Sequence, residues 1–470
     1  MNSKPAHRRH AVVVGASIGG MCAARALAPH FERVTVLDKD TLPEGAQLRR
    51  GVPQGNQPHA LQMRGRRELE ALYPGLIDAI KVQGALELDP IREFARLTPH
   101  GWMPRHGGTG AVAIAASRPL LESTMRRLLL AQHPNVHVVQ GARVVEFLHE
   151  RRWNELWVLG VRTEGAIEGS QNLLADVVVD ATGRGTKTPK WLASVGLPAP
   201  EELRVDAHCN YATRHYRAPA HAENLWWRSL IIDQVPPDQP RGCVIFGVED
   251  RRWIVTAIGT DGDYAPGDEA GWLAFLKSLR SPLAYELVRR ATPLSEISQS
   301  RTTVNRWKQM HRYEGHLNGL LLFGDAVCGF NPSYGQGITA SALAASSLAR
   351  ALARTGEPFN RHFLRRYYRA QAAFLGDAWA LSTSLDFRWR NTEGAPPRFH
   401  AFTGALTGLA EQVILHDPQL MRAAIPLADF GASRWSLMTP SFTARFLRGL
   451  WRHALERPVL EQEIDLGIAA

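Results

Sequence analysis

The chain has 470 residues, 45% of them hydrophobic, which is enough to fill two or three domains or one large interleaved domain. The 55 Lys and Arg exceed the 45 Asp and Glu by a formal charge of +10, but they form no basic block or aromatic-interleaved stripe, so we expect anionic cofactors and no nucleic acid. Scattered cysteines and the lack of a long apolar run predict a cytoplasmic protein without a metal site or a membrane span.

The N-terminal part predicts a dinucleotide site. A short β-branched strand, residues 11–14, runs into the turn GASIGG and a good helix-forming segment. This turn matches the dinucleotide fingerprint at Gly15 and Gly20, with Ser17 at the place of the middle glycine. A second strand, VTVLD, ends in Asp38, where an acidic side chain can accept hydrogen bonds from ribose hydroxyls.

A long polar loop follows this second strand and is dense in turn residues. Its residues Arg49, Arg50, Gln54 and His59 are candidates for contacts with a cofactor or a nicotinamide donor. A solvated loop with ordinary polar side chains explains them equally well.

Further along, helices are predicted over residues 63–72 and 76–82, and a third begins with Ser117 as its N-cap. The segments NVHVVQG, ARVVEFLHE and ELWVLGVRTE predict strands of a small meander inserted in a parallel sheet. The next strand, in LADVVVDATG, is of the buried type and ends in Asp180 and a glycine–threonine turn.

Residues 207–260 alternate in the manner of antiparallel strands and predict a second domain. The aromatic residues Tyr211, Trp226, Trp227 and Phe246 in these strands either line an apolar substrate pocket or face the core.

The stretch LLLFGDAVCGFNPSYGQGITA begins as an apolar strand, turns at Gly324 and Asp325, and reaches Gly335, Gln336 and Gly337 before an alanine-rich helix. Glycines at a helix N-terminus let the backbone approach an anionic ring or phosphate, although ordinary strand–helix connections are also glycine-rich. Because ligands collect at the carboxyl ends of parallel strands, three such glycine-rich ends predict one shared cleft.

Helical segments dominate from residue 357 to the end. The segment FTARFLRGLWRHALE is amphipathic, with Phe442, Phe446, Leu450 and Trp451 opposed by arginines. It either packs on the body of the protein or docks on a membrane surface, so at most peripheral membrane contact is expected.

These motifs together resemble a known family. GASIGG with Asp38, VVVDATG, and FGDA with NPSYGQG resemble, in order and spacing, the three FAD signatures of the class A flavoprotein monooxygenases, relatives of para-hydroxybenzoate hydroxylase. The segments RRGVPQG, SRPLLE, DATGRGTKTPKWL and FNPSYGQG resemble most closely the subgroup with the flavin epoxidases of polyether antibiotic biosynthesis. The resemblance covers about the first 350 residues and departs from its relatives at Asn56 and Gln57, where they carry an arginine and a histidine.

We therefore expect an α/β fold in three parts. A discontinuous Rossmann-type FAD-binding domain is expected over residues 1–85, 111–205 and 305–360. An interleaved antiparallel-sheet substrate domain is expected over 86–110 and 206–304, followed by a helical C-terminal region over 361–470.

The resemblance implies noncovalent FAD. It implies that the first glycine turn and Asp38 hold the ADP half, that Arg118 and Asp325 contact the ribityl-pyrophosphate region, and that Pro332 and the GQG segment lie against the isoalloxazine ring. The segment around Asp180 would serve the dinucleotide and the nicotinamide donor. The implied cofactor contacts are Gly15, Ser17, Ile18, Gly19, Gly20, Asp38, Lys39, Arg50, Gln54, His59, Arg118, Val144, Asp180, Gly183, Gly324, Asp325, Gly335, Gln336, Gly337 and Ile338.

The implied activity is that of an FAD-dependent monooxygenase of secondary metabolism. It would use NAD(P)H, bound transiently, and O2 to epoxidise or hydroxylate a hydrophobic small molecule through a flavin C4a-hydroperoxide. No histidine or tyrosine can be singled out as a catalytic base. One alternative is a flavin reductase or dehydrogenase of isoprenoid-like substrates. Another is a flavin halogenase, although the GWxWxIP signature is reduced to the fragment GWMP at Gly101. An RNA-binding or redox-sensing flavoprotein is suggested only by the charge.

Overall fold

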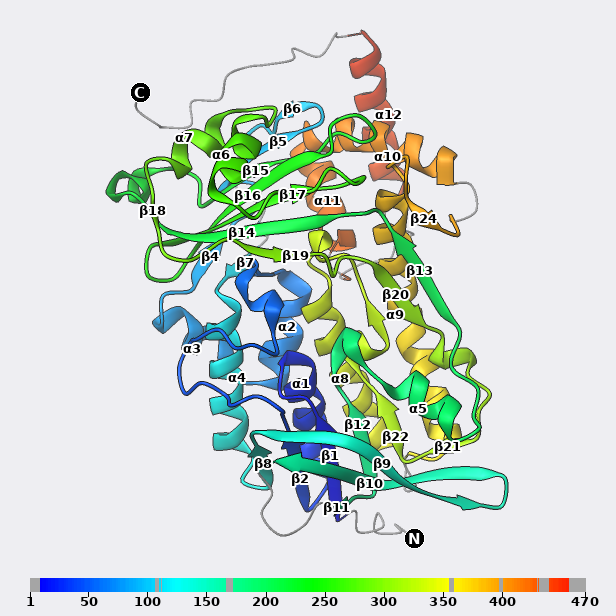
Figure 1. The fold of residues 1–470 in the computed structure, drawn as a ribbon. Coiled ribbons are helices and arrows are strands. Elements are labelled where there is room, and N and C mark those ends of the chain that lie inside the picture. The colour runs from blue at the N-terminus through cyan, green and yellow to red at the C-terminus, as the bar shows by residue number, and fades with distance from the viewer. Residues whose placement is uncertain are drawn as a thin grey trace.

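The computed structural model describes residues 9–105, 110, 112–165, 172–354, 359–396, 400–428, 430 and 439–455 (Figure 1). Some residues of the expected domains lie outside this description. Among them are residues 106–109 of the expected substrate domain and residue 456, which ends the last amphipathic segment. Within the described residues, none of the helices combines the length and the apolar character that a membrane crossing needs.

A five-stranded parallel sheet, sheet A, lies at the bottom of Figure 1 with the strand order β22-β12-β1-β2-β8. Its strands are β1 (His10–Val14), β2 (Arg33–Leu37), β8 (Val136–Val139), β12 (Val177–Asp180) and β22 (Leu320–Leu322). Val14 pairs with both Leu37 and Asp180, and Asp180 pairs with Leu322. The carboxyl ends of these strands therefore lie side by side, as the doubly wound prediction requires.

Besides residues 142–165, which contribute Phe147, Leu156 and Val161 to its core, sheet A is covered by helices that each have an apolar face. They share one core with the sheet and are α1 (Ile18–Leu27), α2 (Met63–Leu72), α3 (Leu76–Val82), α4 (Arg118–Gln132) and α8 (Gly337–Ala353). The bounds of α2 and α3 match the prediction. Ser117 is the N-cap of α4, where its Oγ accepts a 3.3 Å hydrogen bond from the N–H of Leu120.

The predicted meander is partly wrong. β8 is not part of it but pairs in parallel with β2 as the edge strand of sheet A, because α4 returns the chain to that edge. The other predicted strands form a separate small sheet. Its members are β9 (Ala142–Arg152), β10 (Glu155–Gly165), β11 (Asn172–Leu174) and β21 (Leu317–Asn318).

The upper part of Figure 1 is an eight-stranded, mostly antiparallel sheet, sheet C. Its strands are β5 (Phe94–Thr98), β6 (Gly101–Trp102), β14 (Asn210–Arg217), β15 (Ser229–Ile232), β16 (Arg241–Val248), β17 (Arg252–Gly259), β18 (Thr292–Pro293) and β19 (Ser298–Ser300). Helices α6 (Glu269–Lys277) and α7 (Leu283–Val288) pack on one face, which buries Trp227 at 2% exposure. Trp227 therefore faces the core, whereas Tyr211 and Phe246 lie on the opposite face.

Short elements join these two sheets. One small sheet contains β3 (Ala60–Leu61), β4 (Leu86–Leu88) and β7 (Ala113–Ala115), and another, sheet E, contains β13 (Glu202–Asp206), β20 (Asn305–Lys308), β23 (Cys328–Gly329) and β24 (Glu393–Gly394). Helix α5 (Thr188–Ser194) follows β12.

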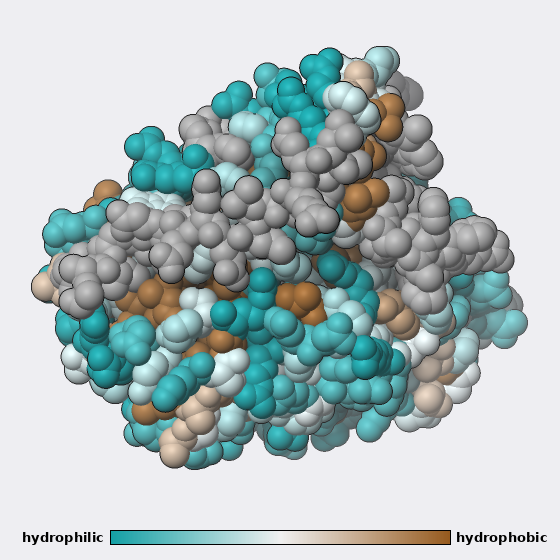
Figure 2. All heavy atoms as spheres, turned by 90° about the horizontal axis from the view of Figure 1, so that it is seen from above, coloured by the Kyte–Doolittle hydropathy of each residue, from teal (hydrophilic) through white to brown (hydrophobic). Residues whose placement is uncertain are grey.

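The C-terminal part is helical, as predicted. It comprises α9 (Arg361–Asp386), α10 (His400–Leu415), α11 (Pro418–Ala428) and α12 (Pro440–Leu455). A Cβ added at Gly449 of α12 would lie 2.4 Å from Cγ1 of Val413, and Arg445 forms a 2.6 Å ion pair with Asp417. Helix α12 thus packs on α10 and α11, while Leu447 and Trp451 stay exposed. Figure 2 views this end of the molecule, where apolar side chains form separate patches among polar ones.

Candidate functional site

The three glycine-rich strand ends meet at one place. A Cβ added at Gly324, after β22, would lie 3.9 Å from Cα of Gly19 in the first turn. One added at Gly183, after β12, would lie 3.9 Å from Cβ of Asp325, and one added at Gly337 would lie 3.7 Å from Oδ1 of Asp325. Asp325 is therefore central to the site, and its other neighbour is Arg184, with Nε 3.6 Å from Oδ2.

The first turn needs its outer glycines for steric reasons. Gly15 has a φ of +107°, and a Cβ there would lie 2.7 Å from the carbonyl oxygen of Ala181. A Cβ at Gly20 would lie 1.7 Å from the carbonyl oxygen of Gly15. Ser17, in contrast, is the N-cap of α1, and its hydroxyl donates to Oε1 of Glu122 at 2.8 Å. The middle fingerprint position thus contributes a side chain to a polar cluster.

This cluster of charges lies at the carboxyl ends of β1 and β2. Asp38 is 7% exposed, accepts a 2.7 Å hydrogen bond from the N–H of Ala16, and lies 3.2 Å from Nη1 of Arg49. Arg49 also pairs with Asp40 at 2.9 Å and with Glu122 at 3.5 Å. Its Nη2 is buried without a hydrogen-bond partner among the described residues. A buried donor of this kind requires an acceptor, which a bound ligand can supply.

Arg118 closes the other side of the cluster. Its Nε lies 2.6 Å from Glu122, its Nη2 donates to Ser17 at 2.8 Å, and its Nη1 lies 3.5 Å from Nε2 of His59. Burial alone raises the pKa of Glu122, but Arg118 and Arg49 outweigh it and hold this pKa below its ordinary value. Burial, with Arg118 beside it, lowers the pKa of His59 to about 4, so His59 is neutral at physiological pH.

Four other implied cofactor contacts are less buried than this cluster. Arg50, Gln54 and Lys39 are exposed, and the arginine directed to the charged cluster is Arg49 instead of Arg50. The sequence cannot distinguish Arg49 from Arg50, because an irregular loop has no periodicity that predicts which of two neighbouring side chains points toward the cluster. Val144 is half-buried on β9, where it packs against the core around sheet A.

Asp180 is brought to the strand ends, but its carboxylate is already occupied. Oδ1 accepts from the N–H and the hydroxyl of Thr182 at 3.0 and 2.6 Å, and Oδ2 accepts from the hydroxyls of Thr186 and Thr188. Its four acceptor bonds shape the turn that carries Gly183. Asp180 thus holds this turn, and the cofactor contact implied for its segment stays a prediction.

The segment implied to face the flavin ring begins with the short helix η7 (Pro332–Tyr334) and leads into α8. Gly335 has a φ of +65°, which glycine adopts without strain. Gln336 is 3% exposed, and its Oε1 has no hydrogen-bond partner among the described residues. Pro332 is exposed, whereas Ile338 is buried in the core behind the segment.

A buried polar network that contacts this segment is not indicated by any of the sequence motifs. Asp386, the last residue of α9, accepts a 2.7 Å hydrogen bond from the hydroxyl of Tyr334 and a 3.1 Å bond from Nδ2 of Asn331. Tyr211 of β14 donates to Oδ1 of Asn331 at 2.9 Å. One signal was available, since Ser382 and Asp386 place two small polar side chains four residues apart on one face of a long helix.

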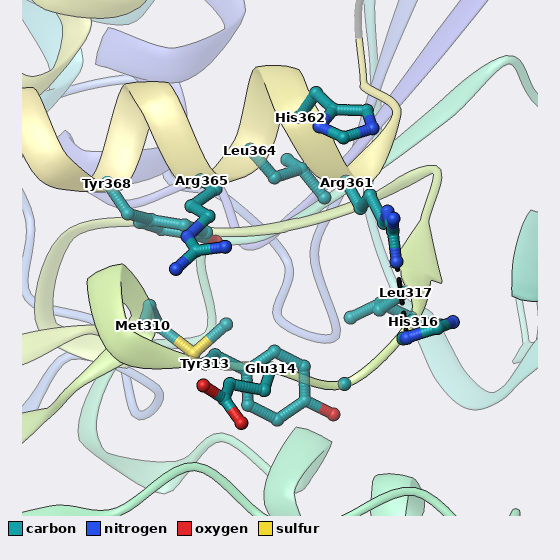
Figure 3. Close-up of a pocket in the computed structure, with 11 residues that line it drawn as sticks. Met310, Tyr313, Glu314, His316, Leu317, Arg361, His362, Leu364, Arg365 and Tyr368 are labelled. Atoms are coloured by element: carbon teal, nitrogen blue, oxygen red, sulfur yellow. Dashed lines mark hydrogen bonds between the residues drawn. The ribbon is translucent and has the colours of Figure 1, made fainter.

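A separate cavity of about 320 Å³ lies between the short helix η5 (Met310–Arg312), β21 and the start of α9 (Figure 3). Arg361 and His316 lie together at one edge of it, with Nη1 of Arg361 3.2 Å from Nε2 of His316. None of its lining residues belongs to the implied cofactor set. The described part of the chain contains no cluster of His, Cys, Asp or Glu that could bind a metal, and its cysteines Cys22, Cys209, Cys243 and Cys328 are free and buried.

The site fits a dinucleotide such as FAD. The backbone of the first turn approaches closely without Cβ atoms, and Arg49 offers an unused donor beside Asp38. Space is also open at Gly337, where α8 begins and its N–H groups favour negative charge. Gly15, Asp38 and Arg49 would hold the ADP half, Arg118 and Asp325 would contact the ribityl-pyrophosphate region, and Gly335 to Gly337 would face the ring.

Comparison with known proteins agrees with this fold. No family model matches the chain. Protein Rv3254 from Mycobacterium tuberculosis (strain ATCC 25618 / H37Rv) is 32% identical over 406 residues, which cover 84% of this chain and 84% of that protein.

Similar solved structures include p-nitrophenol 4-monooxygenase PnpA from Pseudomonas putida DLL-E4, with a TM-score of 0.65, 17% identity, and coverage of 91% of this chain and 99% of that one. The flavin-dependent brominase Bmp2 matches with a TM-score of 0.66, 13% identity, and coverage of 95% and 99%. PqsL, a probable FAD-dependent monooxygenase from Pseudomonas aeruginosa, matches with a TM-score of 0.56, 18% identity, and coverage of 81% and 97%. The chain therefore has the fold of flavin-dependent monooxygenases and their relatives.

Proposed function

This chain belongs to the protein family of Protein Rv3254 from Mycobacterium tuberculosis, and we propose that it is an FAD-dependent monooxygenase that uses NAD(P)H and O2. The observation that carries the proposal is the convergence of three glycine-rich strand ends beside the unpartnered Nη2 of Arg49. FAD bound there would supply the electron transfer from NAD(P)H to O2. The overall reaction consumes NAD(P)H, a proton, O2 and the substrate, and it yields NAD(P)⁺, water and the oxygenated product.

We further propose that the substrate is a hydrophobic small molecule that binds on the inner face of sheet C. Tyr211 lies on this face and touches the flavin-facing segment through Ser333 at 2.6 Å. Ile258 pairs with Tyr211 across the strands and therefore shares its face. Residues that pair across neighbouring strands form rows on this face. In the row next to Tyr211 and Ile258, Val244 pairs with Ile231, and both side chains are only half-buried. The same face also carries Thr213 and Thr256, whose hydroxyls are hydrogen-bonded to each other at 2.8 Å. The apolar side chains beside the proposed flavin would exclude water and bind an apolar substrate.

The same face is bordered by the C-terminal helices. Phe94 of β5 lies in one apolar cluster with Met421 of α11 and Ile414 of α10. Arg96 pairs with Ile231 and ends the row that contains Val244. The Nε of Arg96 lies 2.7 Å from Asp233, so the positive charge of Arg96 is already balanced. This supports a neutral substrate with an apolar body. Epoxidation of an alkene, as in the polyether subgroup, is our preferred reaction, since the half-buried side chains named on this surface, Ile258, Val244 and Ile231, include no base for hydroxylating a phenol.

Val244→Glu is expected to reduce substrate-stimulated NAD(P)H oxidation at least tenfold with FAD retained, because it places a charge in the proposed apolar surface. The matched control is Val82→Glu, since Val82 is 88% exposed on α3. Stopped-flow flavin reduction with and without substrate measures the effect. An unchanged stimulation in folded Val244→Glu would place the substrate elsewhere.

The purified protein is expected to contain noncovalent FAD, because the site offers backbone approach and charged side chains while the cysteines are buried away from solvent. Acid precipitation should release the yellow chromophore into the supernatant. Colour that stays in the pellet, or protein that never takes up FAD, contradicts the proposal.

Assays with ¹⁸O2 then separate the alternative activities. Label in the product supports a monooxygenase, halide-dependent product supports a halogenase, and turnover without O2 supports a reductase of isoprenoid-like substrates.

A further inference from the structure

We propose that Asp386 is a positioning residue that holds the segment of residues 331–337 in the conformation that presents Gly335 and Gly337 to the cofactor. The inference rests on the proposed function and deepens it. It assigns a role to the C-terminal helical region, for which the sequence offers no motif.

Direct contacts carry the first step. Asp386 is 1% exposed, and its carboxylate accepts hydrogen bonds from the hydroxyl of Tyr334 at 2.7 Å, from Nδ2 of Asn331 at 3.1 Å and from Nδ2 of Asn305 at 2.5 Å. Two of these donors belong to the proposed flavin-facing segment. The exposed Pro332 and Ser333 lie between them, so the carboxylate connects both ends of η7.

A second set of bonds fixes this anchor to the rest of the molecule. Oδ1 of Asn305, on β20, accepts from the N–H of Asn331 at 2.7 Å and from the hydroxyl of Ser382 at 2.8 Å. Ser382 lies one turn before Asp386 on α9. The last turn of α9 and sheet E thus hold Asn331 through both its backbone and its side chain, and Tyr211 adds a contact from sheet C.

The charge of Asp386 has no partner cation, since no salt bridge among the described residues includes it. The titratable groups that interact with it are Tyr334 on the segment, Tyr211 on β14, Cys209 just before β14, and the carboxylate of Asp206 on β13. Asp206 is itself paired with Arg204 at 2.9 Å. Burial outweighs the hydrogen bonds and raises the pKa of Asp386 to about 7, so its charge changes near neutrality.

Ionisation would therefore tighten the anchor. The ionised carboxylate accepts all three bonds, with Tyr334 and Asn331 on Oδ1 and Asn305 on Oδ2. The protonated acid must donate through one of these oxygens, so it weakens either a direct bond to the segment or the bond to Asn305, which itself binds the N–H of Asn331. FAD affinity should then rise with pH through about 7. The stability of the empty protein should move the other way, because a carboxyl whose pKa is raised on folding loses its contribution as pH rises from the unfolded value toward the folded one.

The experiment compares wild type with Asp386→Asn, and uses Asp377→Asn as the control on an exposed position of the same helix. FAD dissociation constants are measured by flavin fluorescence between about pH 5.5 and 8.5, with the thermal midpoint measured at each pH. We expect Asp386→Asn to bind FAD roughly tenfold more weakly at high pH, to lose the pH dependence, and to release more peroxide per NAD(P)H. Asp377→Asn should match wild type.

If Asp386→Asn does not fold, Tyr334→Phe removes one bond from the carboxylate and should give a smaller loss of affinity. A folded variant of either kind with wild-type FAD affinity, pH profile and coupling overturns the inference, even if its thermal midpoint falls. Wild-type protein that fails to bind FAD overturns the proposed function itself, whereas wild type that binds FAD beside an unaffected variant overturns only the role of Asp386.

Discussion

Gly337→Ala is expected to lose FAD affinity roughly ten- to hundredfold while its fold stays intact. The protein has room for the methyl group, since a Cβ at Gly337 would meet nothing closer than Oδ1 of Asp325, at 3.7 Å. Its φ also lies outside the left-handed region. Any loss must then come from contact between the methyl group and a ligand lying against the start of α8.

Equilibrium dialysis of FAD and the thermal midpoint without cofactor measure the two effects separately. Gly376→Ala is the matched control, because Gly376 is also a helical glycine with open space, its nearest neighbour being Trp307 at 3.9 Å. Gly335→Ala should instead lose stability, since its φ of +65° disfavours alanine. If Gly337→Ala keeps full FAD occupancy and releases no more peroxide per NAD(P)H than wild type, the GQG segment does not lie against the flavin ring.

Asp38→Ala is the second change with a large expected effect, again roughly ten- to hundredfold in FAD affinity, because charge-assisted bonds to the ribose are lost. If Asp38 served only to bind the ribose, Asp38→Ala would keep its full folding stability. The structure adds a stability cost of about 1–3 kcal/mol, since the N–H of Ala16 loses its acceptor and Arg49 loses one of its carboxylates.

Asp38→Asn separates these contributions. The amide oxygen can still accept from Ala16, so most of the stability should return while the charge beside Arg49 is missing. Urea unfolding and FAD titration of both variants measure this. If both variants keep wild-type FAD affinity, the adenosine ribose is bound elsewhere and the proposed orientation of the cofactor is wrong.

The sequence alone determined the features that depend on local sterics and periodicity. Gly20 is required by its contact with the carbonyl oxygen of Gly15 inside one strand–turn–helix unit, and Gly15 by its own φ of +107°, so the fingerprint could be recognised without the rest of the fold. The bounds of α2 and α3 follow from apolar spacing and a proline stop. The alternation in residues 207–260 predicted sheet C, because side chains of a strand alternate between its faces.

The tertiary structure decided which polar side chains reach the site. Arg49 and Arg50 are chemically equal, and only the path of the loop selects Arg49. Asp180 has the position of a ligand contact, but threonines that follow it occupy both of its oxygens. Asp386 meets Tyr334 over fifty residues away in the chain, because the end of α9 packs beneath η7. Contacts between distant segments leave no local pattern, so their partners become visible only when the chain is folded.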